Sequence, residues 1–179
     1  FGVKYGICNP LYGVQMVFSE DMQDAFCRAL NDWLVKEWLD KDARLRGSIV
    51  IPTQSVEKSV AEIERCAKDS RFVQVLMLVM GDMPLGKRHY WPIYAVAERL
   101  GLAVGIHAGS AYHNPPTSVG WGSYHIEDYV AQATAFQTQL TSLIVEGVFA
   151  RHPKLKMVML ESGFTWLPAY LWRLHKFWR

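Results

Sequence analysis

The sequence predicts an α/β fold built on a parallel β-sheet. Short apolar runs of strand character alternate five times with longer segments in which apolar residues recur every three or four positions, as they do in amphipathic helices. The strand runs are almost continuously apolar, which is typical of parallel strands covered by helices. The run at residues 102–107 ends in a histidine, and ligands gather at the carboxyl ends of strands in such folds.

The first strand and helix lie in the first 39 residues. A short strand is expected near residues 5–8, before a loop that contains proline and glycine. Ser19 is expected to cap a helix that runs to about Leu39, because Glu20 and Asp21 favour the positive end of the helix dipole. Its apolar face is expected to contain Met22, Ala25, Phe26, Ala29, Leu30, Trp33 and Leu34.

Four strands and their helices follow in alternation. Strands are expected at residues 47–51, 72–79, 102–107 and 155–160. Helices are expected from Ser55 to about residue 67, at residues 90–100, at residues 126–150 and from about Trp166 onward. The stripe of the long helix contains Val130, Ala133, Phe136, Gln137, Leu140, Ile144 and Val148. The irregular stretch from Ala108 to about Tyr124 is long, and stretches of that length are usually lids or binding loops.

Two architectures fit this order. Five strands could form a complete open, doubly wound parallel sheet, whereas a (β/α)₈ barrel would need three more strands. The residues alone leave both open. Length and pattern indicate one domain over residues 1–179. Because the chain starts at Phe1 and stops inside a helical pattern, it is expected to be an excerpt.

Composition restricts the classes of molecule that the chain is expected to bind. The net charge of +2, with 20% charged residues and no basic stripe, argues against nucleic acid and favours a small molecule. Seven tryptophans and 13% aromatic residues suggest a large core or a homo-oligomer interface. No apolar run approaches a membrane span. Three widely spaced cysteines without a paired motif favour a reducing cytoplasm.

Two strand ends carry candidate chemistry. His107 ends one strand and Glu161 follows the next, and an imidazole and a carboxylate there can share a divalent cation. Two other interpretations stay open: His107 is a hydrogen-bonded core residue, and Glu161 is a surface carboxylate at the next helix. Asp82 follows the strand at 72–79 and could face the same mouth, although turn carboxylates are common.

The loop after His107 supplies further candidates. His113 and His125 could line a pocket or transfer protons, and Trp121 and Tyr124 could stack on a planar substrate. Solvated or loop-anchoring roles would also explain these side chains. The loop therefore predicts a substrate-binding group of His113, Trp121 and Tyr124.

Five segments together resemble the amidohydrolase-related family, a branch of the metal-dependent hydrolase superfamily that includes aminocarboxymuconate-semialdehyde and resorcylate-type decarboxylases. These segments are residues 46–52, 71–76, 83–94, 105–109 and 152–168, and the likeness runs through nearly the whole chain. The resemblance implies a partial (β/α)₈ TIM barrel, covering about strands 2–6 of the barrel. It also implies a divalent metal, zinc or manganese.

The resemblance assigns roles to three residues. His107 matches the fifth-strand metal ligand. Glu161 or Ser162 stands where many members have the sixth-strand histidine, so these two are the catalytic candidates. The first-strand ligands and the eighth-strand aspartate would lie outside the 179 residues.

The implied function is that of a metal-dependent hydrolase or nonoxidative decarboxylase acting on a small carboxylated or cyclic substrate, with the 179 residues alone inactive. One alternative is a non-catalytic α/β domain that self-associates through its aromatic surface, with His107 structural. Another is an enzyme of different mechanism in an open sheet.

Overall fold

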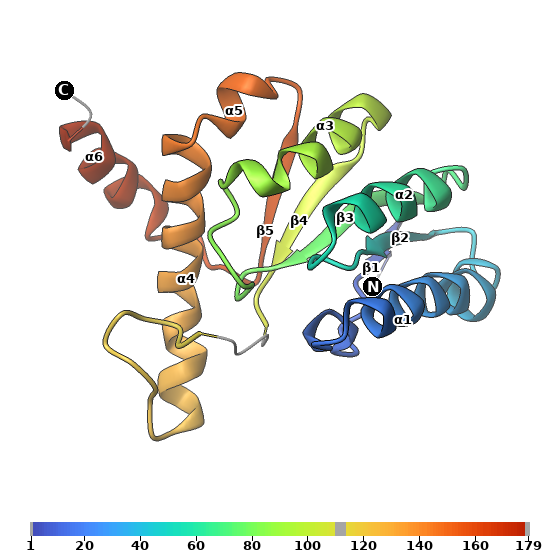
Figure 1. The fold of residues 1–179 in the computed structure, drawn as a ribbon, viewed down its shortest axis with the longest axis horizontal. Coiled ribbons are helices and arrows are strands. Elements are labelled where there is room, and N and C mark those ends of the chain that lie inside the picture. The colour runs from blue at the N-terminus through green and yellow to red at the C-terminus, as the bar shows by residue number, and fades with distance from the viewer. Residues whose placement is uncertain (1, 110–113, 178–179) are drawn as a thin grey trace.

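The computed structural model describes residues 2–109 and 114–177, in which five strands form a single parallel sheet (Figure 1). The strands are β1 (Gly6–Cys8), β2 (Leu45–Val50), β3 (Phe72–Leu78), β4 (Ala103–His107) and β5 (Lys156–Leu160). They lie side by side in the order of the sequence, and every neighbouring pair is parallel. All five strands predicted from the apolar runs are confirmed.

The helices alternate with the strands as predicted. They are α1 (Glu20–Leu34), α2 (Val56–Cys66), α3 (Trp91–Leu100), α4 (His125–Val145), α5 (Val148–Arg151) and α6 (Leu167–Phe177). Short helical turns precede or extend some of them: η1 (Val14–Met16), η2 (Val35–Leu39) and η3 (Arg88–Tyr90). Ser19 caps α1 through a hydrogen bond from the Met22 amide. The single helix predicted over residues 126–150 is wrong, because Gly147 adopts a left-handed conformation (φ 79°) between α4 and α5.

Strand order decides between the two architectures. A doubly wound sheet reverses its strand order at a switch point, and the order β1-β2-β3-β4-β5 contains no reversal. Successive right-handed crossovers then place the helices on the same face and curl the sheet towards a barrel. Figure 1 shows the helices arranged around the outside of the strands. The fold is therefore a partial TIM barrel, and the open doubly wound sheet is wrong.

The two faces of the sheet have different chemistry. On the outer face, Ile49, Met77 and Ile106 belong to the main hydrophobic core beneath the helices. On the inner face, the buried Ser48 hydroxyl donates to the Asn9 side-chain oxygen (2.7 Å), and the Gln74 amide donates to the same oxygen (3.1 Å). Because successive residues of a strand face opposite sides, His107, which follows Ile106, belongs to the inner face.

A glycine makes room for this inner polar layer. A Cβ on Gly105 would lie 2.4 Å from the Gln74 amide nitrogen, so a side chain there would displace Gln74. Gly105 precedes His107 by two residues on β4 and therefore faces the same side. The polar layer thus lies directly below the strand end that carries His107.

The predicted apolar face of α1 is largely wrong. The buried residues of α1 are Gln23, Cys27, Asn31 and Leu34, while Met22, Phe26 and Trp33 are exposed. The strand β1 ends at Cys8, so the β2 edge beyond Gly47 has no strand partner there. Asn31 satisfies that edge instead, accepting from the Val50 amide (2.9 Å) and donating to the Val50 carbonyl (2.8 Å).

The predicted stripe of α4 is wrong in part for a similar reason. Phe136 and Leu140 are buried as expected, but Val130 is exposed. Gln139 is buried because its side chain accepts from the Leu85 amide and donates to the Val79 carbonyl, each at 2.7 Å. This helix therefore faces a loop backbone as well as the core. Among the described residues, no helix combines the length and apolar character needed to cross a bilayer.

Candidate functional site

His107 occupies a fixed, buried position at the mouth of the half-barrel. It is the last residue of β4, lies in register between Leu78 of β3 and Leu160 of β5, and is 6% exposed. Its Nδ1 hydrogen-bonds to the Ala108 carbonyl oxygen. Because a carbonyl only accepts, this hydrogen bond requires the proton on Nδ1, and in the neutral imidazole the lone pair is then on Nε2. That is the arrangement of a metal-binding histidine.

Glu161 lies opposite this nitrogen. Its carboxylate Oε1 is 4.0 Å from His107 Nε2, and its side chain is 66% exposed. The residue follows β5 directly and has a φ of 61°, a left-handed conformation that is unfavourable for a residue with a side chain. Strained backbone of this kind often occurs at functional sites. Since α6 begins only at Leu167, Glu161 lies well before the helix that it would cap in the alternative interpretation.

The donor set of this pair fits a divalent cation. Zinc and similar ions bind imidazole nitrogen and carboxylate oxygen. The two side chains, with their nearest atoms 4.0 Å apart, would hold one ion if the exposed Glu161 side chain moved slightly towards His107. In the described part of the chain, no third histidine, cysteine, aspartate or glutamate completes a metal-binding group. The described part of the half-barrel thus brings together two candidate ligand side chains, His107 and Glu161.

Ser162 is engaged in its own turn. Its hydroxyl donates to the Gly163 carbonyl (2.7 Å), and its carbonyl accepts from the Trp166 indole (2.8 Å). These contacts shape the turn that leads into α6. Between Glu161 and Ser162, the carboxylate is the group directed at His107.

A groove of about 370 Å³ opens beside Glu161. It is lined by Ala108, Gly109, His125, Asp128, Tyr129, Val130, Gln132, Ala133, Glu161, Ser162 and Gly163. His125, considered from the sequence as a residue that could line a pocket, does line the groove. Asp128, Tyr129 and Gln132 of α4 were missed, because sequence reasoning treated the rest of this helix only as packing. The signal that could have found them is position, because the first turns of α4 follow the long loop at the strand end.

The loop residues predicted to bind substrate have mixed outcomes. His113 lies outside the described residues. Trp121 and Tyr124 are 60% and 74% exposed, and neither is among the described residues that line the groove. The amides of Ser123 and Tyr124 both donate to the Glu127 carboxylate (2.8 Å each), which anchors the start of α4.

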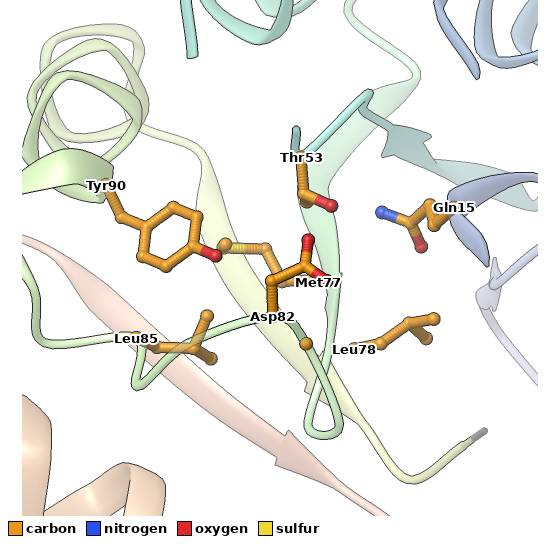
Figure 2. Close-up of a pocket in the computed structure, with 8 residues that line it drawn as sticks. Gln15, Thr53, Met77, Leu78, Asp82, Leu85 and Tyr90 are labelled. Atoms are coloured by element: carbon orange, nitrogen blue, oxygen red, sulfur yellow. The ribbon is translucent and has the colours of Figure 1, made fainter. Parts of the chain in front are cut away.

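A second, smaller pocket lies at the ends of β2 and β3 (Figure 2). Its volume is about 10 Å³, and it is lined by Gln15, Thr53, Met77, Leu78, Gly81, Asp82, Leu85 and Tyr90. Burial, together with the negative charge of Asp82, raises the pKa of Tyr90 to about 12. Asp82, considered from the sequence as a residue of the mouth, therefore lies in this pocket, close enough to act electrostatically on Tyr90.

Comparison with known proteins gives a consistent picture. A family model described as amidohydrolase matches residues 3–179. A γ-resorcylate decarboxylase of Rhodococcus jostii is 27% identical over 180 residues, which cover 90% of this chain and 52% of that protein. The chain spans about half the length of the curated relatives it matches.

Solved structures share the fold. An amidohydrolase of Mycobacterium avium subsp. paratuberculosis matches with a TM-score of 0.79 and 24% identity, over 97% of this chain and 48% of that one. A dihydroxybenzoic acid decarboxylase of a Polaromonas species, solved with bound manganese and the inhibitor 2-nitroresorcinol, matches with a TM-score of 0.73 and 21% identity. That match covers 96% of this chain and 54% of the decarboxylase.

Proposed function

The chain belongs to this amidohydrolase family, and from that premise we propose that it is the central part of a metal-dependent hydrolase or nonoxidative decarboxylase. Residues 1–179 then form one incomplete barrel domain of that enzyme. One observation carries the proposal. The Nε2 atom of His107 lies 4.0 Å from the Glu161 carboxylate, at the carboxyl ends of two adjacent strands.

His107 and Glu161 would hold a divalent cation together with ligands from outside the 179 residues. When bound, the cation supplies Lewis-acid chemistry to substrate oxygens. His107 keeps its orientation through the Nδ1 hydrogen bond to Ala108, and burial excludes water from its ring. The Glu161 carboxylate would have one of two roles: bound to the cation it is a ligand, and unbound, with its side chain 66% exposed, it would transfer a proton to the reacting carbon or leaving group. Manganese in the Polaromonas relative supports manganese as one choice of metal, beside zinc.

The proposed substrate is a small carboxylated aromatic molecule. Four curated relatives are γ-resorcylate decarboxylases, which favours decarboxylation over hydrolysis. The groove beside Glu161 offers the aromatic ring of Tyr129 for stacking and the imidazole of His125 for a carboxylate. His113, Trp121 and Tyr124 stay proposals as additional contacts from the loop.

We also propose an oligomeric state and a cellular compartment for the intact protein. The exposed aromatic residues Phe26, Trp33 and Trp38 support a homo-oligomer. Three free cysteines, of which Cys27 and Cys66 are buried, support a reducing compartment such as the cytoplasm.

The test compares two buried histidines in the full-length protein. His107→Ala is expected to lower bound metal, measured by elemental analysis after dialysis, by at least about tenfold, and to abolish carbon dioxide release from 2,6-dihydroxybenzoate. His152→Ala is the control, because His152 is also 6% exposed and faces a carboxylate, Glu98 at 3.4 Å, but lies before β5 at the other end of the sheet. Unchanged metal and turnover in His107→Ala would contradict the proposal.

A non-catalytic, self-associating domain is the second candidate. It is favoured by the same exposed aromatic residues and by the absence of a third metal-binding side chain in the described part of the chain. Full-length protein that binds no metal yet forms a stable oligomer would support this alternative.

A further inference from the structure

Hydrogen bonds from both neighbouring strands hold the backbone at the end of β4. The His107 carbonyl accepts from the amide of Val79, the residue that follows β3 (2.9 Å). The Ala108 amide donates to the Leu160 carbonyl at the end of β5 (3.1 Å). The chain is therefore fixed by its neighbours as far as the Ala108 nitrogen.

The next peptide group, which joins Ala108 to Gly109, has a hydrogen bond at each end. Its carbonyl oxygen accepts from Nδ1 of His107. Its amide donates to the side-chain oxygen of Gln132 in α4, at 3.4 Å. Because a peptide group is planar, the direction of its N–H also sets the direction of its C=O. One rigid group therefore connects Gln132 to the imidazole of His107.

This connection acts mainly through geometry. Hydrogen bonds in a chain polarise one another and strengthen each bond by only roughly 10–30%. Rotation of the peptide plane, in contrast, moves the Ala108 oxygen away from Nδ1 and breaks the hydrogen bond that keeps the proton there. The neutral imidazole could then carry its proton on Nε2, the nitrogen that lies 4.0 Å from Glu161. A proton on Nε2 removes the lone pair that a metal ion needs.

Gly109 restrains the plane of this peptide only weakly. Its φ is 146°, in a region that residues with a side chain rarely adopt, and glycine rotates about φ more freely than any other residue. A contact from outside the strand is therefore needed to hold the peptide plane, and the Gln132 side chain provides one.

The packing of α4 gives Gln132 a fixed position. Gln132 is 7% exposed and lies one helical turn before Phe136, which is 0% exposed. Seven residues further along the same face, Gln139 accepts from the Leu85 amide and donates to the Val79 carbonyl, each at 2.7 Å. A buried side chain on a helix held in this way has little freedom left to lose, so one hydrogen bond can orient the peptide.

We propose that Gln132 is a positioning residue for His107. Its side-chain oxygen holds the Ala108–Gly109 peptide in the plane that keeps the His107 proton on Nδ1 and the lone pair on Nε2. The inference rests on the proposed function, in which Nε2 binds a metal ion, but the position of the proton can be measured without metal.

The first measurement is therefore the tautomer of His107 in metal-free, full-length protein. It is read from the nitrogen NMR resonances of the neutral imidazole, which are assigned by their loss in His107→Ala. The unmodified protein is expected to have the proton on Nδ1. Gln132→Met keeps a side chain of similar shape without the amide oxygen, so a mixture of the two tautomers is expected. Gln132→Glu keeps an acceptor oxygen and is expected to restore the single tautomer.

The second measurement is the dissociation constant for manganese, obtained by titrating the same metal-free proteins. Gln132→Met is expected to raise it about three- to tenfold, towards the lower end of the effects seen for groups that orient a metal-binding histidine. Gln132→Glu is expected to bind manganese at least as tightly as the unmodified protein, because it keeps the acceptor and adds a negative charge beside the groove.

Gln139→Met is the matched control. Gln139 lies on the same helix and is also 7% exposed, but its hydrogen bonds are shorter and go to peptide groups other than Ala108–Gly109. This variant is expected to lower the thermal midpoint at least as much as Gln132→Met. It is also expected to keep the His107 tautomer and the manganese dissociation constant of the unmodified protein.

Gly109→Ala disturbs the same peptide without changing Gln132, and it serves as the second variant if Gln132→Met does not fold. A Cβ at Gly109 would have its nearest neighbour at 3.9 Å, so space is available, but the φ of 146° is strained for alanine. A mixture of tautomers is expected here as well.

The inference is overturned if the unmodified protein has its proton on Nε2, or if folded Gln132→Met or Gly109→Ala keeps the single tautomer. It is also overturned if Gln139→Met changes the tautomer as much as Gln132→Met does. Loss of substrate affinity alone in Gln132→Met, with tautomer and manganese affinity unchanged, would instead make Gln132 a substrate contact of the groove and would overturn the inference too. Failure of the proposed function is seen separately, as manganese content that does not change in His107→Ala.

Discussion

Glu161 is the only non-glycine residue of the described chain with a left-handed backbone, at a φ of 61°. Such a conformation costs a residue with a Cβ atom on the order of 1 kcal/mol. It turns the chain immediately after β5 and leaves the carboxylate 4.0 Å from His107. The unfavourable backbone and the placement of the carboxylate therefore go together.

Two substitutions at Glu161 distinguish the effect of backbone strain on stability from the effect of the carboxylate charge. Both Glu161→Gly and Glu161→Ala remove the carboxylate, but only glycine accepts a φ of 61° without strain. We predict that the glycine variant exceeds the alanine variant in free energy of unfolding by about 1 kcal/mol, measured by urea denaturation of the full-length protein. Equal stabilities would show that the conformation of Glu161 is not strained.

At the residue scale, the sequence was enough to predict which polar side chains stand at the ends of strands. An apolar run followed by a polar residue indicated both His107 and Glu161, but no pattern gives the distance between residues 54 positions apart. Asp128, Tyr129 and Gln15 were missed because their roles depend on how α4 and η1 pack near the strand ends. Such packing is long-range, and periodicity reports only local structure.

At the scale of elements, hydrogen bonds hold the loop after β3 against α4 and α3. Leu85 donates its amide to Gln139 (2.7 Å), and Gly86 donates its amide to the Ser142 hydroxyl (3.0 Å). The Tyr94 hydroxyl donates to the Leu85 carbonyl (2.6 Å). This loop carries Asp82, so its attachment to α4 positions the small pocket.

Gly86 is essential to this attachment. A Cβ on Gly86 would lie 2.1 Å from the Ser142 carbonyl oxygen and 2.4 Å from its carbon, in the backbone of α4. We predict that Gly86→Ala lowers the free energy of unfolding by about 3 kcal/mol, seen as a lower thermal midpoint. Gly81→Ala is the control in the same loop, since the nearest atom to its Cβ would be 3.9 Å away. A neutral effect of Gly86→Ala would contradict the tight contact with α4.

Helices α1 and α2 are joined through a buried carboxylate. The Glu62 side chain is completely buried and accepts hydrogen bonds from Arg65 (2.7 Å) and Asn31 (2.8 Å). Asn31 in turn pairs with the Val50 backbone. Burial alone would raise the pKa of Glu62, but the hydrogen bonds from Arg65, Asn31 and Cys66 outweigh burial and leave the pKa lowered.

The lowered pKa of Glu62 implies a pH-dependent contribution to stability. The contribution is present above the ordinary glutamate pKa, about 4.3, and is lost as the pH falls through the lower folded-state value. We predict that Glu62→Gln is less stable than the unmodified protein by about 2 kcal/mol at pH 7, and that the difference narrows from about pH 5 to pH 3. Glu64→Gln is the control, because its side chain is 51% exposed. A constant difference across this range would contradict the assignment.

At the scale of the whole molecule, the alternation of strands and helices was predictable and the closure of the sheet was not. Parallel strands with covering helices build both open sheets and barrels, so the residues alone could not distinguish them. The sequential strand order in the structure distinguishes the barrel from the open sheet. The resemblance to a family had already implied a barrel. The faces of α1 and α4 were mispredicted because Asn31 and Gln139 bond to backbone groups that only the tertiary fold brings near.

The half-barrel leaves apolar surface uncovered along its outer strands. In the described chain, β1 and β5 each pair on one side only, and Ile7 of β1 and Val158 of β5 are 51% and 37% exposed. Unpaired strand edges with exposed apolar residues promote association between chains. The candidate metal site is also incomplete in the described chain, where His107 and Glu161 have no third histidine, cysteine, aspartate or glutamate beside them.

These features predict how residues 1–179 behave when produced alone. Because two ligands hold a divalent ion far more weakly than three or four, the isolated chain is expected to retain well under one metal ion per chain after dialysis and to release no carbon dioxide from 2,6-dihydroxybenzoate. Its open edges are expected to make it associate as its concentration rises, measured by light scattering after size-exclusion chromatography. The full-length protein is the control for all three measurements. A monomeric isolated chain that keeps one metal ion and turns over substrate would show that the half-barrel carries a complete site.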